Sequence, residues 1–194
     1  MLATGNWQQW YYVYMKSFRP ELLKAAVYGA NDGIITTFAV VAGVAGAGLS
    51  PQIVIILGIA NMMADAFSMA VGDFLGEKSE RQLRLSKGEK NVKSQAVWRT
   101  SVVTFGAFVV AGTMPLIPYV GELFGVRVGD GWRFPLAIIF TALALFVVGS
   151  LRTIVTKGSW IKNGLEMLSI GAIAAMVAYG LGFGVKQLVG DVGI

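Results

Sequence analysis

The chain has 194 residues, of which 55% are hydrophobic and only 14% are charged, and its mean hydropathy is +0.65. A water-soluble domain of this length is far less apolar, so a lipid bilayer is the expected surrounding, with space for about five spanning helices of roughly 20 residues and no second folded domain. The chain contains neither cysteine nor histidine, which excludes disulfides, thiolate and imidazole metal sites and histidine-based catalysis and leaves carboxylates, amides, hydroxyls, carbonyls and methionine sulfur as ligands.

The first 21 residues are predicted to form a segment at the membrane surface. Their aromatic side chains suit the headgroup level of a bilayer, and they include Trp7, Trp10, Tyr11, Tyr12 and Tyr14. The segment lacks a basic stretch followed by an apolar core, so a cleaved export signal is not expected. A disordered tail is the alternative for this segment.

Two antiparallel spans are expected in the first half of the chain. The stretch 33–64 contains no charged residue, but it is too long for one span and is interrupted by turn-forming glycines and a proline. We therefore place helices at about 22–49 and 52–76. The polar segment that follows is predicted to be a short cytoplasmic connector, 77–96, whose first part continues the second helix; a contact with lipid headgroups is the alternative.

Three further uncharged runs are each long enough to cross a bilayer, namely 100–121, 134–151 and 167–185. Pro115 and Pro118 are expected to end or kink the first of these runs. The sequence thus predicts an all-α, polytopic membrane protein with five spans, forming a single transmembrane domain over residues 1–194.

The Lys and Arg residues are distributed unevenly between alternate connections. With a cytoplasmic amino terminus, 13 of the 16 basic residues lie on the inner side, and only Arg127, Arg133 and Lys186 lie outside. Because cytoplasmic connections collect basic residues, we predict this orientation, with the carboxyl terminus on the outer side. Topology then explains the net charge of +5, and no nucleic-acid partner is expected.

Two carboxylates are predicted to lie in the middle of the membrane. Asp32 and Asp65 are ten and eleven residues from the inner ends of their helices, which is about 15 to 16 Å deep at 1.5 Å per residue. Such a group costs roughly 2.5 to 3.5 kcal/mol on insertion scales and is a functional candidate by default. No basic residue is expected at this depth, so a bound cation would explain both acids; the alternative is that Asp32 pairs with a basic residue or caps a helix break.

The second helix carries further candidate ligands at a spacing of four, which places Asn61, Asp65, Met69 and Asp73 on one helical face. Hard oxygens with one soft sulfur suit a borderline ion such as iron(II), cobalt or manganese better than calcium or magnesium. For Met69, filling of the core is the alternative. In the first helix, Gly29 and Gly33 either permit a local distortion that frees carbonyl groups for an ion or allow close helix packing.

The segments ELLKAAVYGANDGIITTFAVVAGVAGAGLS and GIANMMADAFSMAVGDFLGEKSE resemble the first two spans of the vacuolar iron transporter family, with its small-Asn/Ser-Asp-Gly and Ser-Met-small-small-Gly motifs. The resemblance implies a five-helix protomer, a homodimer with the ion path between the copies, and export of iron(II) or manganese(II) from the cytoplasm in exchange for protons. By motif position, Asp32 and Met69 match the family's residues on the metal path, and Glu21 matches a carboxylate near the cytoplasmic entrance.

Three features depart from the plant members of that family. Asn61 stands where they have a glutamate, although Asp65 lies one turn further along the same face, and Ala25 stands where they have an aspartate. They also insert a glutamate-rich cytoplasmic domain between the second and third spans, where this chain has only the short connector. We therefore expect a short member of the family that lacks the metal-collecting domain.

The sequence as a whole predicts a transporter, not an enzyme, that exports iron(II) or manganese(II) by proton antiport. The expected partners are the lipid bilayer, the metal ion, protons and a second copy of the chain, and no permanently bound cofactor is expected. The predicted metal-binding residues are Asp32, Asp65, Met69, Asn61, Asp73 and Glu21. A prokaryotic plasma membrane is the expected location. The alternative function is a non-transporting membrane assembly or sensory protein derived from the same fold.

Overall fold

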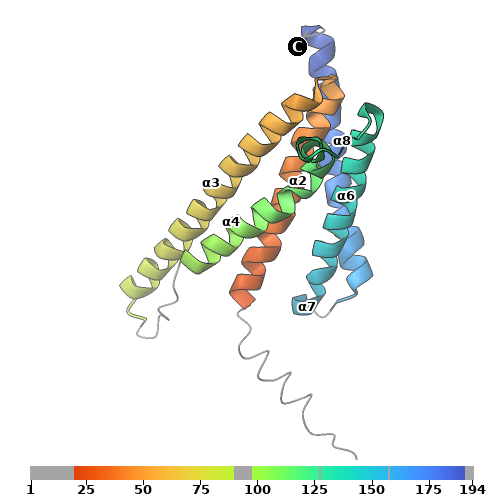
Figure 1. Cartoon of the computed structure of the whole chain (residues 1–194). Coiled ribbons are helices and arrows are strands. Elements are labelled where there is room, and N and C mark those ends of the chain that lie inside the picture. Colours follow the sequence, from red (N-terminus) through yellow and green to blue (C-terminus); the bar gives the residue numbers. More distant parts are fainter. Residues whose placement is uncertain (1–19, 90–97, 127, 157, 191–194) are drawn as a thin grey trace, which may run out of the picture.

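The computed structural model describes residues 20–89, 98–126, 128–156 and 158–190, and the regular elements in these ranges are all helical (Figure 1). Five helices are long and apolar enough to cross a membrane: α2 (Pro20–Ala47), α3 (Pro51–Ser86), α4 (Trp98–Gly112) with its continuation to Val120, α6 (Asp130–Leu151) and α8 (Trp160–Val189). The predicted all-α fold with five spans is thus confirmed. Most of the predicted surface segment 1–21 lies outside the described residues.

The break between the first two spans lies where the glycines and the proline predict it. Gly48 has a φ of 69°, a conformation that suits glycine at the end of a helix. The Gly48 and Leu49 N–H groups donate to the carbonyls of Ala45 and Val44 at 3.0 and 3.1 Å. Pro51 then opens α3, at a position where its missing N–H leaves no helical hydrogen bond unmade.

Helix α3 is longer than a bilayer requires. Its 36 residues extend about 54 Å at 1.5 Å per residue, whereas the hydrocarbon core is about 30 Å thick. The helix continues past the predicted span and ends at Ser86, two residues before Gly88, whose φ is 78°. The predicted helical extension is therefore confirmed as far as it is described; residues 90–97 of the connector lie outside the described ranges.

The last three spans differ from the predicted ranges mainly at their ends. α4 stops at Gly112, and the chain continues through short turns that contain both prolines, namely η1 (Met114–Leu116), α5 (Ile117–Val120) and η2 (Gly121–Phe124). This confirms that prolines end the helix. α6 begins at residue 130 instead of 134, and α8 runs from 160 to 189 instead of 167 to 185, because charged residues near membrane surfaces are compatible with a helix that continues beyond the apolar run.

Helix α2 lies at the centre of the bundle and packs on α3, α4, α6 and α8 (Figure 1). Its glycines face the backbones of its neighbours. A side chain on Gly29 would overlap the Thr104 carbonyl oxygen of α4, one on Gly33 would overlap that of Phe108, and one on Gly46 would overlap that of Tyr179 in α8. α2 is continuous from residue 20 to 47, so close packing, and not the predicted distortion with freed carbonyls, explains these glycines.

The two ends of the bundle differ in charge. We define the basic end as the end at which α2, α4 and α8 begin and α3 and α6 end (Figure 1). By their helix positions, eight described basic residues belong to it, Lys24, Lys78, Arg81, Arg84, Lys87, Arg99, Arg152 and Lys162, whereas Arg133 and Lys186 belong to the opposite end. This arrangement follows the asymmetry on which the predicted orientation rests.

Candidate metal path

Asp32 of α2 and Asp65 of α3 lie at the same depth and interact electrostatically. Measured from the end opposite the basic end, they are 15 and 14 residues into their helices, or about 22 and 21 Å at 1.5 Å per residue. Both side chains are half-buried. The structure therefore brings together the two acids that the sequence places at mid-membrane.

Asn61 holds Asp65 in place, since its side-chain amide donates a hydrogen bond of 2.7 Å to the Asp65 Oδ2 atom. The two residues are one helical turn apart on α3, so the contact is local to that helix. An amide donor fixes a carboxylate but leaves its charge in place. Asn61 thus belongs to the predicted group as a partner of Asp65.

Neither Asp32 nor Asp65 forms an ion pair with a basic residue in the described part of the chain. Asp32 also lies within an uninterrupted helix, where its backbone carbonyl accepts a hydrogen bond of 2.8 Å from the Thr36 hydroxyl. Both alternatives that would make Asp32 purely structural are therefore absent from the described residues. Two acids that interact at this depth call for protons or a cation.

Met69 lies on the face of α3 that carries Asn61, Asp65 and Asp73, which we call the acidic face, and it also contacts the core. It packs against a buried cluster formed by Met62, Ala66 and Phe108, as its alternative role predicts. It also lies one turn from Asp65 on α3 and is half-buried. The sulfur of Met62, which belongs to the same buried cluster, accepts a hydrogen bond of 3.9 Å from the Thr113 hydroxyl.

A second group of acids lies nearer the basic end. The Thr104 hydroxyl of α4 donates to Asp73 Oδ2 at 3.5 Å. Glu77, one turn further along α3, interacts electrostatically with Asp73, Glu80, Glu21 and Lys24. Glu21 is exposed in the first turn of α2. The six predicted residues thus fall into two groups. We call the group around Asp32 and Asp65, in the middle of the bundle, the inner group, and the group around Asp73 and Glu21, nearer the basic end, the outer group.

Sequence analysis missed two residues of the outer group. Glu77 continues the spacing of four that begins at Asn61, and this signal was available, but its position in a polar segment favoured a solvated connector. Thr104 gave no signal, because a single threonine in an apolar helix commonly bonds its own backbone. Only the packing of α4 on α3 shows that it meets Asp73.

The acids of the described residues lie in pairs and not in larger clusters. Among the described residues, no three acidic side chains lie close enough together to bind one metal ion. Asp32 and Asp65 supply two carboxylates, and the outer group is displaced towards the basic end. A divalent ion held at the inner group would need additional ligands.

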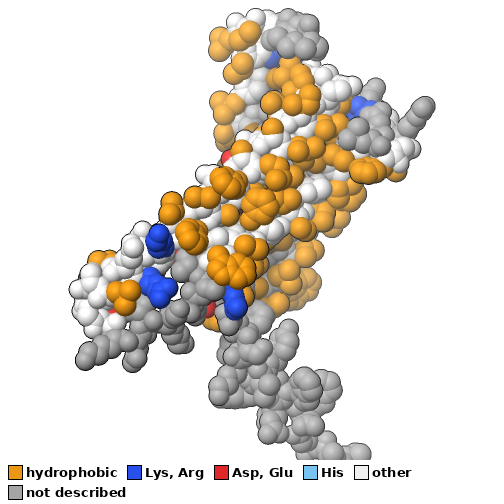
Figure 2. Space-filling view, turned by 60° about the vertical axis from the view of Figure 1, so that its left-hand side comes forward, with side chains coloured by type: hydrophobic (Ala, Val, Ile, Leu, Met, Phe, Trp, Pro, Cys, Tyr) orange, Lys and Arg blue, Asp and Glu red, His pale blue; other side chains and the backbone are white. Residues whose placement is uncertain are grey.

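Small residues form an exposed row on α3 beside the acidic face. They recur every four residues and are Ala60, Ala64, Ser68, Gly72 and Gly76. Apart from the adjacent residues and the backbone of α3 itself, no described residue comes within 4 Å of a Cβ built on Gly72 or Gly76. Large apolar side chains flank the row, including Ile56 and Phe67, which are 66% and 67% exposed. Figure 2 shows this side of the molecule, with hydrophobic side chains along most of its length and Lys and Arg side chains towards its lower end.

Comparison with known proteins identifies the family. The model of the VIT family matches residues 23–94 and 85–183, which together span most of the chain. Vacuolar iron transporter homolog 4 of Arabidopsis thaliana is 29% identical over 92% of this chain and 89% of its own length. The vacuolar iron transporter of Toxoplasma gondii is 26% identical over 88% of this chain and 76% of its own length.

The alignments with these two relatives differ in length. The alignment with the T. gondii protein extends over 235 positions, more than the 194 residues of this chain, so that relative contains residues without a counterpart here. The alignment with the A. thaliana protein extends over 187 positions. These relatives are eukaryotic and are named for the vacuole, so they give no support to the predicted prokaryotic plasma membrane.

The match extends across both motifs and all five membrane-length helices. The relatives are named as transporters, which agrees with the prediction that this chain is not an enzyme. The chain is an integral, multi-pass membrane protein and belongs to the VIT family, a family of membrane transporters.

Proposed function

We propose that the protein transports iron(II), and also manganese(II), out of the cytoplasm in exchange for protons. The observation that carries the proposal is the pair Asp32 and Asp65, which interact at mid-membrane depth without a described basic partner. The names of the relatives supply the substrate class, because they are called vacuolar iron transporters. In the absence of histidine, carboxylates are the groups able to carry protons along this path.

The predicted residues have different roles along the proposed path. Asp32 and Asp65 alternate between binding the metal and binding protons, and Asn61 positions Asp65. The Met69 sulfur favours a borderline ion over calcium or magnesium. The outer acids, Asp73 and Glu21, receive the ion at the basic end, which we assign to the cytoplasm because basic residues accumulate there.

A homodimer would complete the site. Glycines of α2 that face inward are covered by the backbone of a neighbouring helix, but the row from Ala60 to Gly76 is exposed. Small residues in membrane helices allow a second helix to approach closely. A second α3 packed on this row would bring two sets of acidic faces together, and the additional ligands would come from the partner.

Transport is tested with proteoliposomes that contain an iron-sensitive dye and have an acidic lumen. We expect iron(II) to enter the lumen as protons leave, and manganese(II) to compete with it. Asp32→Asn and Asp65→Asn should each abolish most of this flux, whereas Glu89→Gln, which changes an exposed acid beyond the end of α3, should preserve it. Undiminished flux through Asp32→Asn would refute the proposed path, and flux that ignores the pH gradient would refute the exchange for protons.

The dimer is tested by cysteine cross-linking, for which the chain provides a cysteine-free background. Ser68→Cys lies within the exposed row on α3 and should form a disulfide-linked dimer when membranes are oxidised. Val147→Cys on α6 is a matched control, because it is also exposed but lies on another helix. Equal cross-linking of the two variants, or none in Ser68→Cys, would contradict a dimer formed through this row.

A further inference from the structure

A cavity of about 340 Å³ lies between α2 and α8 near the basic end, separate from the acids of the metal path. Its described lining includes Lys24, Tyr28 and Asn31 of α2, Arg152 after the end of α6, and Met167 of α8. At roughly 30 Å³ per water, this volume equals about eleven waters. The cavity therefore has room for a phosphate group with part of its organic substituents.

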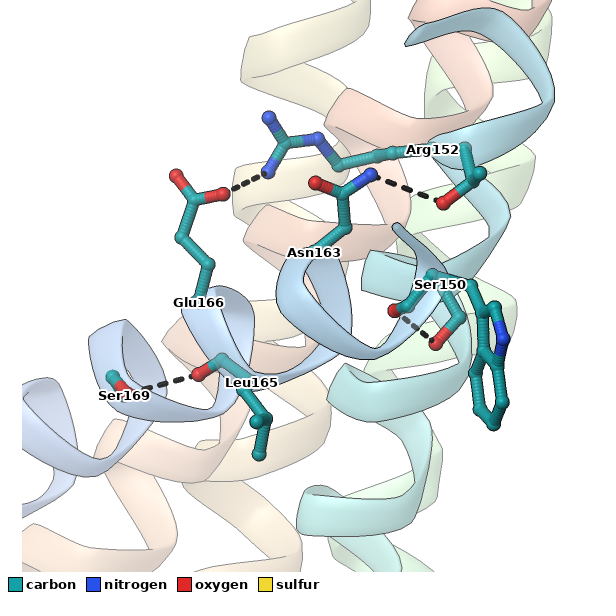
Figure 3. Close-up of polar contacts among 8 residues, drawn as sticks. Ser150, Arg152, Asn163, Leu165, Glu166 and Ser169 are labelled. Carbon is teal, nitrogen blue, oxygen red and sulfur yellow. Dashed lines mark hydrogen bonds and ion pairs between the residues drawn. The ribbon is translucent and has the colours of Figure 1, made fainter. Parts of the chain in front are cut away.

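The charged side chains among the described lining residues are both basic, Lys24 and Arg152. Arg152 is positioned by Glu166 of α8, with 3.5 Å between Arg152 Nη1 and Glu166 Oε2 (Figure 3). A guanidinium has five donors and binds a carboxylate and phosphate oxygens together. The described lining thus includes two basic side chains and no acidic one.

The junction that carries Arg152 is tied together by two further hydrogen bonds, one from α8 to the short helix α7 (Thr153–Thr156) and one from α6 to α8. The Asn163 amide donates to the Thr153 hydroxyl at 3.0 Å, and the Ser150 hydroxyl donates to the Trp160 carbonyl at 3.1 Å (Figure 3). These bonds connect the end of one spanning helix to the start of the next. They hold the guanidinium at a defined place relative to α8.

The cavity is amphipathic along its depth. Lys24 is exposed near the start of α2, whereas Val27 and, on α8, Ile170 supply apolar walls further along their helices from the basic end. Asn31 also lines the cavity, and its buried Oδ1 atom has no hydrogen-bond partner among the described residues.

We propose that this cavity binds an anionic phospholipid, with the phosphate between Lys24 and Arg152 and the acyl chains against the apolar wall. A soluble anion would use the cations but not the wall, and a zwitterionic lipid would set its own positive charge against the two cations. Basic pockets between helix ends at the cytoplasmic side are characteristic sites for anionic headgroups. The assignment does not depend on metal transport.

The test is native mass spectrometry of the delipidated full-length protein. The protein is mixed with equal amounts of dioleoyl phosphatidylglycerol and dioleoyl phosphatidylcholine, which have the same acyl chains. We expect retention of the anionic lipid with a preference on the order of tenfold, and loss of that preference in the double variant Lys24→Gln, Arg152→Gln. Lys78→Gln with Lys162→Gln removes the same charge outside the described lining and should keep the preference.

A competition experiment and two single variants of Lys24 distinguish the remaining explanations of lipid retention. Glycerol 3-phosphate in excess should not displace the lipid, and displacement would show a site for a soluble anion and overturn the proposal. Lys24→Arg keeps the charge and should keep the preference, and Lys24→Gln alone should weaken it if the double variant fails to fold. Equal retention of the two lipids by the unmodified protein, or an unchanged preference in both glutamine variants, would also overturn it.

Discussion

The contact between α2 and α4 predicts the effect of adding a single methyl group at Gly33. A Cβ at this position would lie 2.9 Å from the Phe108 Cα and 3.0 Å from its carbonyl carbon, and closer still to the carbonyl oxygen. Ordinary van der Waals contacts of a Cβ begin at 3.4 Å. All three atoms belong to the backbone, so no rotamer change can relieve the overlap, and the two helices must separate by at least half an ångström.

The cost of Gly33→Ala follows from two opposing effects. Overpacking of a well-packed core costs about 1 to 3 kcal/mol, and a backbone contact belongs at the upper end of this range. Replacing glycine by alanine within a helix stabilises that helix by up to about 1 kcal/mol. We therefore expect a net loss of about 2 kcal/mol in the free energy of unfolding, which is about a 30-fold change in the folding equilibrium.

The assay is unfolding in detergent micelles, followed by far-ultraviolet circular dichroism as dodecyl sulfate is added. Gly106→Ala is the matched control, because Gly106 lies in α4 and, apart from the adjacent residues and the backbone of its own helix, no described residue comes within 4 Å of a Cβ built there. The control should be as stable as the unmodified protein or up to about 1 kcal/mol more stable. Equal stabilities of the two variants would refute the described backbone contact between α2 and α4.

Three further substitutions separate roles within the proposed metal path. Met69→Leu preserves packing against the core and should cost less than about 1.5 kcal/mol in stability. It should nevertheless reduce iron(II) flux relative to manganese(II) flux, because the soft sulfur ligand is lost. Equal losses of flux for both metals would contradict a role for the sulfur. Asn61→Ala removes a hydrogen bond of about 1 kcal/mol and should lower flux about fivefold at limiting metal, with an unchanged flux arguing against positioning of Asp65. Glu77→Gln should raise KM a few-fold at low salt and less at high salt, whereas Glu89→Gln, at an exposed position beyond α3, should leave KM unchanged.

Most of the fold follows from the sequence because the bilayer restricts what each segment can do. Uncharged runs of spanning length, the turn at Gly48 and the prolines after α4 gave the helices in the right order. The ends of α8 were misplaced because Glu166 and Lys186 interrupt the apolar run without interrupting the helix. Charge indicates where a helix meets water, and hydrogen bonding decides where it stops.

The candidate site was predictable in part. The spacing of four along α3 and the matched depths of Asp32 and Asp65 follow from helix geometry alone, and the two acids are indeed close enough to interact. The role of the glycines did not follow, since a glycine permits either distortion or close approach, and only the position of the α4 backbone decides between them. Thr104 was beyond prediction for the same reason, because its contact with Asp73 depends on tertiary packing.

The different ways in which α2 and α3 meet the bundle bear on how a path could open. α2 is held on two sides by contacts in which backbone touches backbone, at Gly33 and Gly46, and such contacts cannot slide without a clash. α3 meets its neighbours largely through side chains; Gly58, for example, faces the flexible end of Leu116. Asp32 therefore lies on a helix with backbone-to-backbone contacts, and Asp65 lies on a helix that meets Leu116 through a flexible side chain. A small rotation of α3 would change the separation of the two acids while α2 stays in place.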